Sequence, residues 1–234
     1  MKKFMFFLIF YSFQLFAAGP MTHLYFAKRW CEIFNVTDLQ VKKEFVLGNL
    51  FPDIRYIAHI PREWTHEFVY SPEEIHAASS PFEAGMKLHA FVDEVREELV
   101  EATGIYAFVL PYAAGHEATL LKFVEEEILA EFFDGRSFSY CLKSILEEEL
   151  RFGLDINVVQ RWHGILGRCM QAKPSWLLWF ASQKGSLFGI PASTLNEWSY
   201  LLPELAKQPV FRDHVQRLLL HMENQLLGGG IVVY

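Results

Sequence analysis

Apolar residues recur along most of this chain at intervals of three and four, the spacing of one face of an α-helix. The segment 81–102 shows the pattern well. Its apolar stripe consists of Met86, Leu88, Phe91, Val92, Val95 and Leu99. Alternating stretches of β-branched residues are few, so we predict an all-α protein.

Glycine and proline residues divide the pattern into helices. The predicted helices cover residues 22–34, 39–50, 81–102, 115–133, 138–151, 155–171, 175–183, 193–206 and 209–227. Thr22 is the expected N-cap of the first helix, and Pro81 suits the first turn of the third. The stretch 51–81 contains four prolines, and we predict a long irregular connection with one helical turn. No repeat or long linker divides the chain, which indicates a compact multi-helix single domain.

The first residues have the layout of a secretory signal. Two lysines precede an apolar run at residues 4–16, which Ala17, Ala18 and Gly19 follow. The run is shorter than the roughly 20 residues of a membrane-spanning helix. A cut after Ala17 leaves a small residue at −1, whereas a cut after Ala18 places the bulky Phe16 at −3.

We assign residues 1–18 to the signal peptide and 19–234 to the mature helical domain. The expected location is therefore outside the cytoplasm, either periplasmic or secreted.

The charge and the cysteine content exclude several kinds of site. The chain has 28 acidic and 21 basic residues, a net charge of −7, and loss of Lys2 and Lys3 would make this −9. An acidic chain lacks the basic groove that long nucleic acid requires. Cys31, Cys141 and Cys169 are far apart and odd in number, so they predict neither a disulfide framework nor a CxxC metal site.

Histidines are concentrated in the first half of the chain. Five of the nine lie between His23 and His89, and His116 follows. His89 and Asp93 are four residues apart in a predicted helix, so both project from one face and could bind one metal ion. Taken alone, each residue also has a plain structural interpretation, such as a polar pair at a helix edge, a capped surface His23 or a turn at Asp53.

Four ordered segments resemble a known pattern. They are Gly19-Pro20-Met21-Thr22-His23, Gly48-Asn49-Leu50-Phe51-Pro52-Asp53-Ile54, His66 after Trp64-Thr65, and Gly85 to Asp93 with its HxxxD element. Together they resemble the zinc-dependent phospholipase C family, which is related in fold and metal site to single-strand-specific zinc nucleases. The resemblance covers about residues 19–120 and implies a compact helical domain of that fold.

The resemblance also implies a set of metal ligands. Asp53, His66, His89 and Asp93 would bind one Zn²⁺ ion, and His23 would join Asp93 at a second ion, so that Asp93 bridges the two. In members with three ions, His116 would supply a ligand of the third. Asp53 and Asp93 are the implied catalytic residues, which orient or deprotonate the attacking water.

Two positions depart from the family pattern. Leu99 stands where a histidine ten residues after His89 is common, and Leu120 stands where an acidic residue four positions after His116 is usual. We therefore expect one to three Zn²⁺ ions, with the first site the best supported and the third lacking ligands.

The resulting functional prediction is an exported metal-dependent phosphodiesterase. The resemblance implies phospholipase C-like hydrolysis of phospholipid phosphodiester bonds by a zinc-activated water. The alternative is a non-catalytic helical binding protein with a degenerate metal site. No GxSxG or GxxxxGK[ST] motif is present, which disfavours serine hydrolases and P-loop NTPases.

Two further segments have open interpretations. The aromatic run at 176–180 predicts either a buried core helix or a surface for peripheral membrane contact. The acidic triplets 125–127 and 147–149 are predicted to be solvated helix faces.

Overall fold

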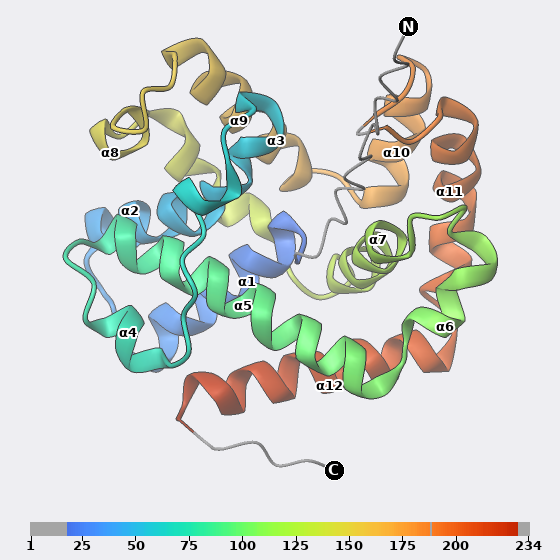
Figure 1. Cartoon of the computed structure of the whole chain (residues 1–234), viewed down its shortest axis with the longest axis horizontal. Coiled ribbons are helices and arrows are strands. Elements are labelled where there is room, and N and C mark those ends of the chain that lie inside the picture. Colours follow the sequence, from blue (N-terminus) through green and yellow to red (C-terminus); the bar gives the residue numbers. More distant parts are fainter. Residues whose placement is uncertain (1–17, 188, 229–234) are drawn as a thin grey trace, which may run out of the picture.

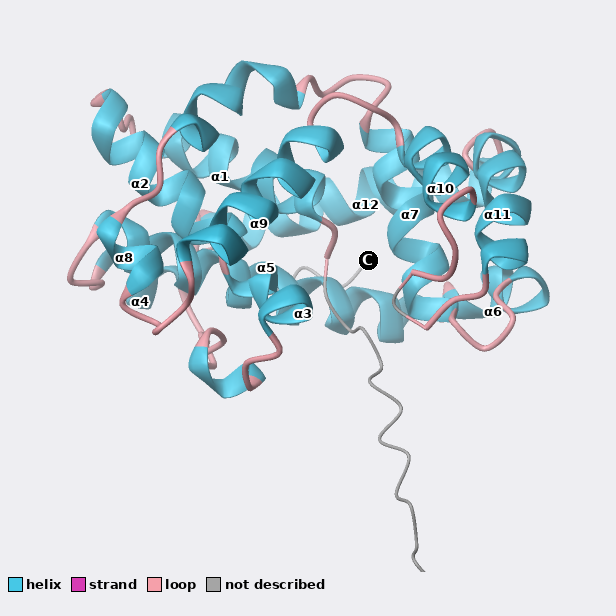
Figure 2. Cartoon of the chain, turned by 90° about the horizontal axis from the view of Figure 1, so that it is seen from above, coloured by secondary structure: helices cyan, strands magenta, loops and turns pink. Residues whose placement is uncertain are grey.

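The computed structural model describes residues 18–187 and 189–228. In this part of the chain all regular elements are helices, and the only β-type pairing is an isolated bridge between Leu187 and Ile190. Figure 2 shows these helices joined by loops. The all-α prediction is confirmed. The predicted signal peptide lies outside the described residues except for Ala18.

Eight α-helices of nine residues or more, with one 3₁₀ helix of nine residues, form most of the described domain (Figure 1). They are α1 (Pro20–Ile33), α2 (Leu39–Leu50), α5 (Pro81–Thr103), α7 (Glu117–Leu129), α9 (Ile156–Cys169), α10 (Pro174–Ser182), α11 (Ala192–Leu205) and α12 (Pro209–Leu226), with the 3₁₀ helix η4 (Gly135–Lys143) as the ninth long helical element. The shorter elements are η1 (Pro52–Ile54), α3 (Arg55–Ala58), η2 (Arg62–Trp64), α4 (Pro72–His76), α6 (Tyr106–Val109), η3 (Leu110–Tyr112) and α8 (Glu147–Leu150). None of the described helices combines the length and apolar character needed to cross a bilayer.

Most predicted helices agree with the structure, and three predictions differ from it. Helix α1 starts at Pro20 with Gly19 as its N-cap, so the expected cap at Thr22 is wrong, and Thr22 is buried inside the helix. The predicted helix 138–151 is wrong in type, because η4 and the short α8 occupy it. The irregular stretch 51–81 contains four short helical elements rather than one turn.

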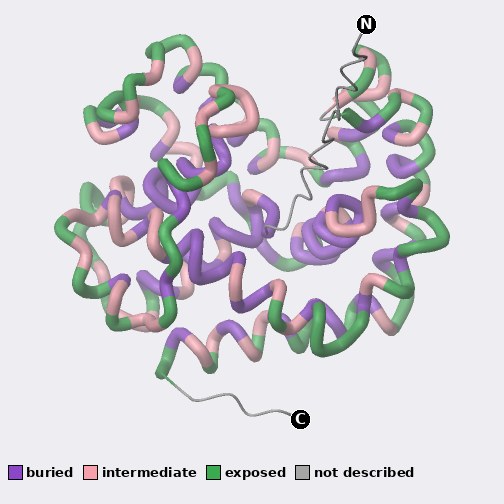
Figure 3. Tube along the Cα trace, in the orientation of Figure 1, coloured by how far each residue is buried: buried purple, intermediate pink, exposed green. Residues whose placement is uncertain are grey.

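The buried side chains form two hydrophobic cores. The first core lies among α1, α2, η4 and α9, and the second among α6, α10 and α11. Helices α5 and α12 contribute to both, and α7 lies mainly in the second core. Figure 3 shows the buried positions gathered where α1, α5 and α7 meet in the middle of the molecule.

A chain of buried charges links the helices that join the cores. Arg96 on α5 donates from Nε to Glu125 Oε2 on α7 at 2.8 Å, and Glu125 Oε1 lies 2.9 Å from His214 Nε2 on α12. All three residues are at most 3% exposed. Since removing one member of such a network leaves a buried charge without a partner, the network fixes how α5, α7 and α12 meet.

Two glycines set the distance between α2 and α5. A Cβ on Gly48 would lie 2.0 Å from the Phe82 carbonyl oxygen, and one on Gly85 would lie 2.1 Å from the Phe45 carbonyl oxygen. Neither carbonyl can move without breaking its helix. The two backbones are therefore in contact over this stretch, which places the residues after Gly48 directly beside α5.

We predict that Gly48→Ala destabilises the protein strongly, because the new methyl group clashes with a helix backbone. The expected loss in the free energy of unfolding is about 3 kcal/mol or more. Urea unfolding followed by circular dichroism measures it.

Gly164→Ala is the matched control. Gly164 lies inside α9, and a Cβ there would meet nothing within 4 Å. Alanine has the higher helix propensity, so this variant should be unchanged or more stable by up to about 1 kcal/mol. Equal effects of the two substitutions would contradict the close-packing account.

Candidate metal centre

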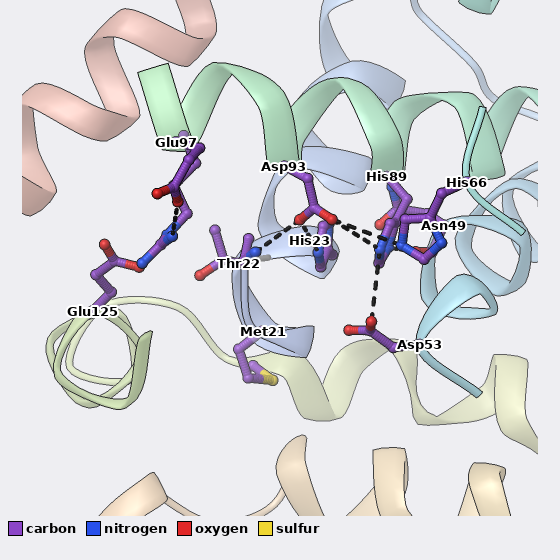
Figure 4. A network of polar contacts seen from close by, with 12 residues as sticks. Met21, Thr22, His23, Asn49, Asp53, His66, His89, Asp93, Glu97 and Glu125 are labelled. Atoms are coloured by element: carbon purple, nitrogen blue, oxygen red, sulfur yellow. Dashed lines mark hydrogen bonds and ion pairs between the residues drawn. The ribbon is translucent and has the colours of Figure 1, made fainter. Parts of the chain in front are cut away.

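Five side chains from four separate segments meet in the first core. His23 lies on α1, Asp53 on η1, His66 just after η2, and His89 with Asp93 on α5. Each is at most 9% exposed. Figure 4 shows them facing one another across α1 and α5. These are the five residues that the resemblance implies for the first two ions.

Asp93 is at the middle of the cluster, and its two oxygens face different histidines. Oδ1 is 3.3 Å from His23 Nε2, whereas Oδ2 is 3.6 Å from His89 Nε2 and 3.8 Å from His66 Nε2. Asp53 Oδ1 lies 4.0 Å from His89 Nε2 on the other side. The backbone N–H of Ala18 also donates to Asp93 Oδ1 at 2.7 Å.

The orientation of His89 is fixed by the close packing of α2 and α5. Its Nδ1 lies 2.8 Å from the backbone carbonyl of Asn49, the residue after Gly48. A carbonyl oxygen only accepts, so Nδ1 carries the proton and Nε2 presents its lone pair to Asp53 and Asp93. The Asn49 amide, oriented to satisfy both ends, joins the His23 carbonyl at 2.9 Å and the His89 N–H at 3.1 Å.

His66 is oriented in the same way by Thr65. The Thr65 hydroxyl lies 3.2 Å from the Pro52 carbonyl and 3.0 Å from His66 Nδ1. The hydroxyl has one proton, which it donates to a carbonyl, and it accepts from Nδ1–H. The Nε2 of His66 is thereby left with a free lone pair, and the loop is tied to the turn that carries Asp53.

The electrostatics of the cluster favour neutral imidazoles and an ionised carboxylate. Burial, with the nearby His23, lowers the pKa of His89 to about 4, and burial with the nearby His89 lowers the pKa of His66 to about 2. Burial alone would raise the pKa of Asp93, but His89 and His23 hold it below its usual range. Neutral imidazole and carboxylate are the protonation states that bind a metal ion.

Several polar atoms of the cluster are buried without a hydrogen-bond partner among the described residues. They are both ring nitrogens of His23, the Nε2 atoms of His66 and His89, Asp53 Oδ1 and Asp93 Oδ2. Leaving such atoms unsatisfied is costly. One shared partner, a cation in contact with several of them, would satisfy them together.

The spacing of these atoms fits a metal ion. His23, Asp53 and His89 offer ligand atoms within 4.8 Å of one another, and so do His66, His89 and Asp93. Ligand atoms about 2.1 Å from a tetrahedral ion are roughly 3.4 Å apart, close to the separations around Asp93. Because His89 Nδ1 is engaged by Asn49, only Nε2 of this residue is available as a ligand atom. His89 is the residue that the two groups share.

His116, the sixth predicted ligand, is not brought to this cluster. It belongs to neither candidate group, and its ring lies 6.4 Å from that of Trp198 on α11. Leu120 is fully buried in the second core, and Leu99 packs against the first. These two positions serve packing, so among the described residues no ligands gather for a third ion around His116.

The acidic triplet of α7 departs most from expectation. Glu125, Glu126 and Glu127 are at most 4% exposed, so the prediction of a solvated face is wrong for them, and Glu149 is also buried. Glu126 accepts from the Met21 N–H at 2.6 Å, and Glu127 accepts from the Ser175 hydroxyl and N–H.

Sequence reasoning also missed two buried cations beside the triplet, Arg96 and Lys122. Val92 and Val100, one turn on either side of Arg96, are a signal of its burial, whereas the neighbours of Lys122 on its helix face, Thr119 and Glu126, give none.

Comparisons with known proteins add no relative to this description. No protein-family model, curated protein or solved structure matches the chain. The geometry of the cluster and the sequence resemblance therefore carry the functional argument.

We predict that Glu126 makes the stability of the metal-free protein depend on pH. Burial raises its pKa from the usual 4.5 to about 7, although backbone N–H groups and Lys122 oppose the shift. A pKa raised on folding means that the stabilisation is fully present below pH 4.5 and is lost as the pH rises through 7. Glu126 should thus lower the free energy of unfolding by about 2 to 3 kcal/mol between pH 5 and pH 8.

Glu126→Gln is expected to lack this part of the pH dependence, since its amide stays neutral and its oxygen can still accept from Met21. Urea unfolding at pH 5, 6.5 and 8 with a chelator present measures both proteins. Glu204→Gln, an exposed position, serves as the control. The same pH dependence in Glu126→Gln and wild type would contradict the assignment.

Proposed function

We propose that this protein is a metal-dependent phosphodiesterase of the phospholipase C type, with Zn²⁺ as its metal. The proposal rests on the buried cluster in which three imidazole Nε2 atoms, Asp53 Oδ1 and Asp93 Oδ2 face one another without a hydrogen-bond partner among the described residues. Mixed imidazole and carboxylate ligands suit zinc. The sequence resemblance supports the same assignment for the same residues.

The residues have distinct roles in this proposal. His66, His89, Asp53 and Asp93 would hold one ion, and His23 with the other oxygen of Asp93 would hold a second. Asn49 and Thr65 keep Nε2 of His89 and His66 deprotonated and aimed at the ions. Bound zinc would lower the pKa of a water molecule and offset the negative charge of a phosphodiester.

The carboxylates carry the proton chemistry. Asp53 Oδ1 has no hydrogen-bond partner among the described residues and can orient an attacking water or accept its proton. Asp93 has less freedom, since Oδ1 already accepts from the Ala18 N–H and both oxygens face histidines. Asp53 is therefore the stronger candidate for the general base.

Exposed aromatic rings near the cluster support an apolar substrate. Trp64, Phe68 and Tyr70 flank His66 in sequence and are 55%, 73% and 83% exposed. A segment that holds a metal ligand and also exposes large rings suits a lipid surface, where aromatic side chains partition readily. Phospholipid is accordingly the proposed substrate, with peripheral membrane contact through this segment and export to the periplasm or medium.

The aromatic run on α10 offers a second surface. Trp176, Trp179 and Phe180 are exposed, whereas Leu178 is buried in the second core. The core interpretation of this run thus holds for Leu178 and fails for the three rings.

A non-catalytic binding protein is the second candidate, and one observation favours it. All five cluster residues are at most 9% exposed, which suits a metal that holds α1, α5 and the 51–66 segment together. In that case zinc would stabilise the fold without hydrolysis.

We predict that wild type binds zinc and hydrolyses a simple diester such as bis(4-nitrophenyl) phosphate. His89→Ala and Asp93→Asn should each lose at least one zinc ion per chain and at least 100-fold in kcat/KM, because His89 is a ligand of the first ion and Asp93 of both. Elemental analysis and hydrolysis are measured on the same samples.

The control is His221→Ala, a half-buried histidine on α12 outside the cluster, which should keep zinc and activity. Zinc bound without hydrolysis would favour the non-catalytic candidate. A wild-type protein that binds no zinc would overturn the proposal.

We further predict that Trp64→Ala with Phe68→Ala weakens hydrolysis of phospholipid in vesicles about tenfold or more, since these rings would partition into the bilayer surface. Hydrolysis of the soluble diester should change less than twofold. Trp176→Ala, on α10, tests whether the effect is local to the His66 segment. Equal losses on both substrates would contradict a role in membrane contact.

A further inference from the structure

Lys122 on α7 is a buried lysine for which the described residues provide no hydrogen bond or ion pair. The residue is 8% exposed, and among the described residues its Nζ has no hydrogen bond and no carboxylate oxygen within 4.0 Å. The other buried ions of α7 are paired, Glu125 with Arg96 and His214, and Glu127 with Ser175. Lys122 is the exception on its helix.

An unpaired ammonium in a protein interior is costly, and a buried lysine normally has a counter-ion. Glu126, one turn away on α7, is a poor one. Its Oε1 accepts from the backbone N–H groups of Met21 and Thr22, and burial raises its pKa to about 7. No described side chain pairs with the Lys122 ammonium, which leaves it available to an anion.

The position of Lys122 shows where that partner would bind. Lys122 and Glu126 are four residues apart and share one face of α7, and Glu126 contacts Met21, two residues before His23. Glu125, beside Glu126, pairs with Arg96, three residues after Asp93. This face of α7 is thus directed to the part of α1 and α5 that carries the cluster, and the charges that act most strongly on Lys122 include Asp53 and Asp93.

The charge balance of the cluster indicates an anion. One divalent ion would neutralise Asp53 and Asp93 together. Lys122 then contributes an uncompensated positive charge, and so does Arg62, whose Nη2 lies 3.8 Å from Asp93 Oδ2 and whose side chain is 40% exposed. A metal-loaded centre of net positive charge, with an ammonium and a guanidinium that both act on its carboxylates, attracts a multivalent oxyanion.

We propose that Lys122 is an anion-binding residue of the metal centre, and that its ammonium binds a non-bridging oxygen of a phosphoryl group placed at the Asp53, His89 and Asp93 cluster. This inference rests on the proposed metal site. It assigns to α7 a part in substrate binding, which the sequence resemblance gives to none of its residues. Lys122 positions the phosphoryl group and holds no metal.

Inorganic phosphate is the probe, titrated by calorimetry into the full mature protein loaded with zinc and freed of excess metal. We expect Lys122→Met to retain the zinc content of wild type and to bind phosphate at least tenfold more weakly. Lys122→Arg, which keeps the charge, should stay within about threefold of wild type. Lys207→Met removes an exposed lysine and should change nothing.

The outcomes separate the two proposals. Unchanged phosphate affinity in zinc-loaded Lys122→Met would overturn the role of Lys122 and leave the metal site intact. Wild type that binds no zinc would overturn both. If Lys122→Met fails to fold by circular dichroism, Lys122→Gln, with a neutral polar end, replaces it under the same criteria.

Discussion

The contact between the backbones of α2 and α5 is the constraint on which the rest of the site depends. Gly48 and Gly85 have no Cβ, so the two helices approach until the Asn49 carbonyl meets Nδ1 of His89. That hydrogen bond sets the tautomer and direction of His89, and the chain continues from Asn49 into the turn that carries Asp53. Trp162 supports the same turn by donating to the Leu50 carbonyl at 3.0 Å. The close packing of α2 and α5 therefore determines how His89 and Asp53 are placed in the candidate metal centre.

The second feature of the molecule is the number of charged side chains that are buried. Between the two hydrophobic cores, Glu125 pairs with Arg96 and His214, and such a network holds helices in one arrangement more than it adds net stability. The cluster around Asp93 differs because more of its buried polar atoms have no hydrogen-bond partner among the described residues. The same interior thus contains a paired ionic network and a cluster of histidines and aspartates that could bind a metal ion.

The sequence allowed the long helices to be predicted well, because their apolar stripes persist for three turns or more. The predicted helix 81–102 is α5 at 81–103. The prediction for residues 138–151 was wrong because the apolar pattern there is short and most of the turns are 3₁₀. Hydrophobic periodicity over so few residues does not distinguish a 3₁₀ helix from an α-helix. His89 and Asp93 could be paired from helical spacing alone. The approach of His23, Asp53 and His66 depended on the resemblance, since an irregular stretch of thirty residues fixes no distance. The burial of Glu126 and Lys122 could not be predicted, since a run of charges indicates solvent unless the partners across the helix interface are known.

If these histidines and aspartates are held together to bind a metal ion, zinc should raise the temperature at which the protein unfolds. A ligand that binds only the folded state stabilises it by an amount that grows with its free concentration. At zinc concentrations about 100 times the dissociation constant, the account predicts a rise in Tm of roughly 5 to 10 °C. The rise should be absent in His89→Ala. A wild-type Tm that does not respond to zinc would contradict the account.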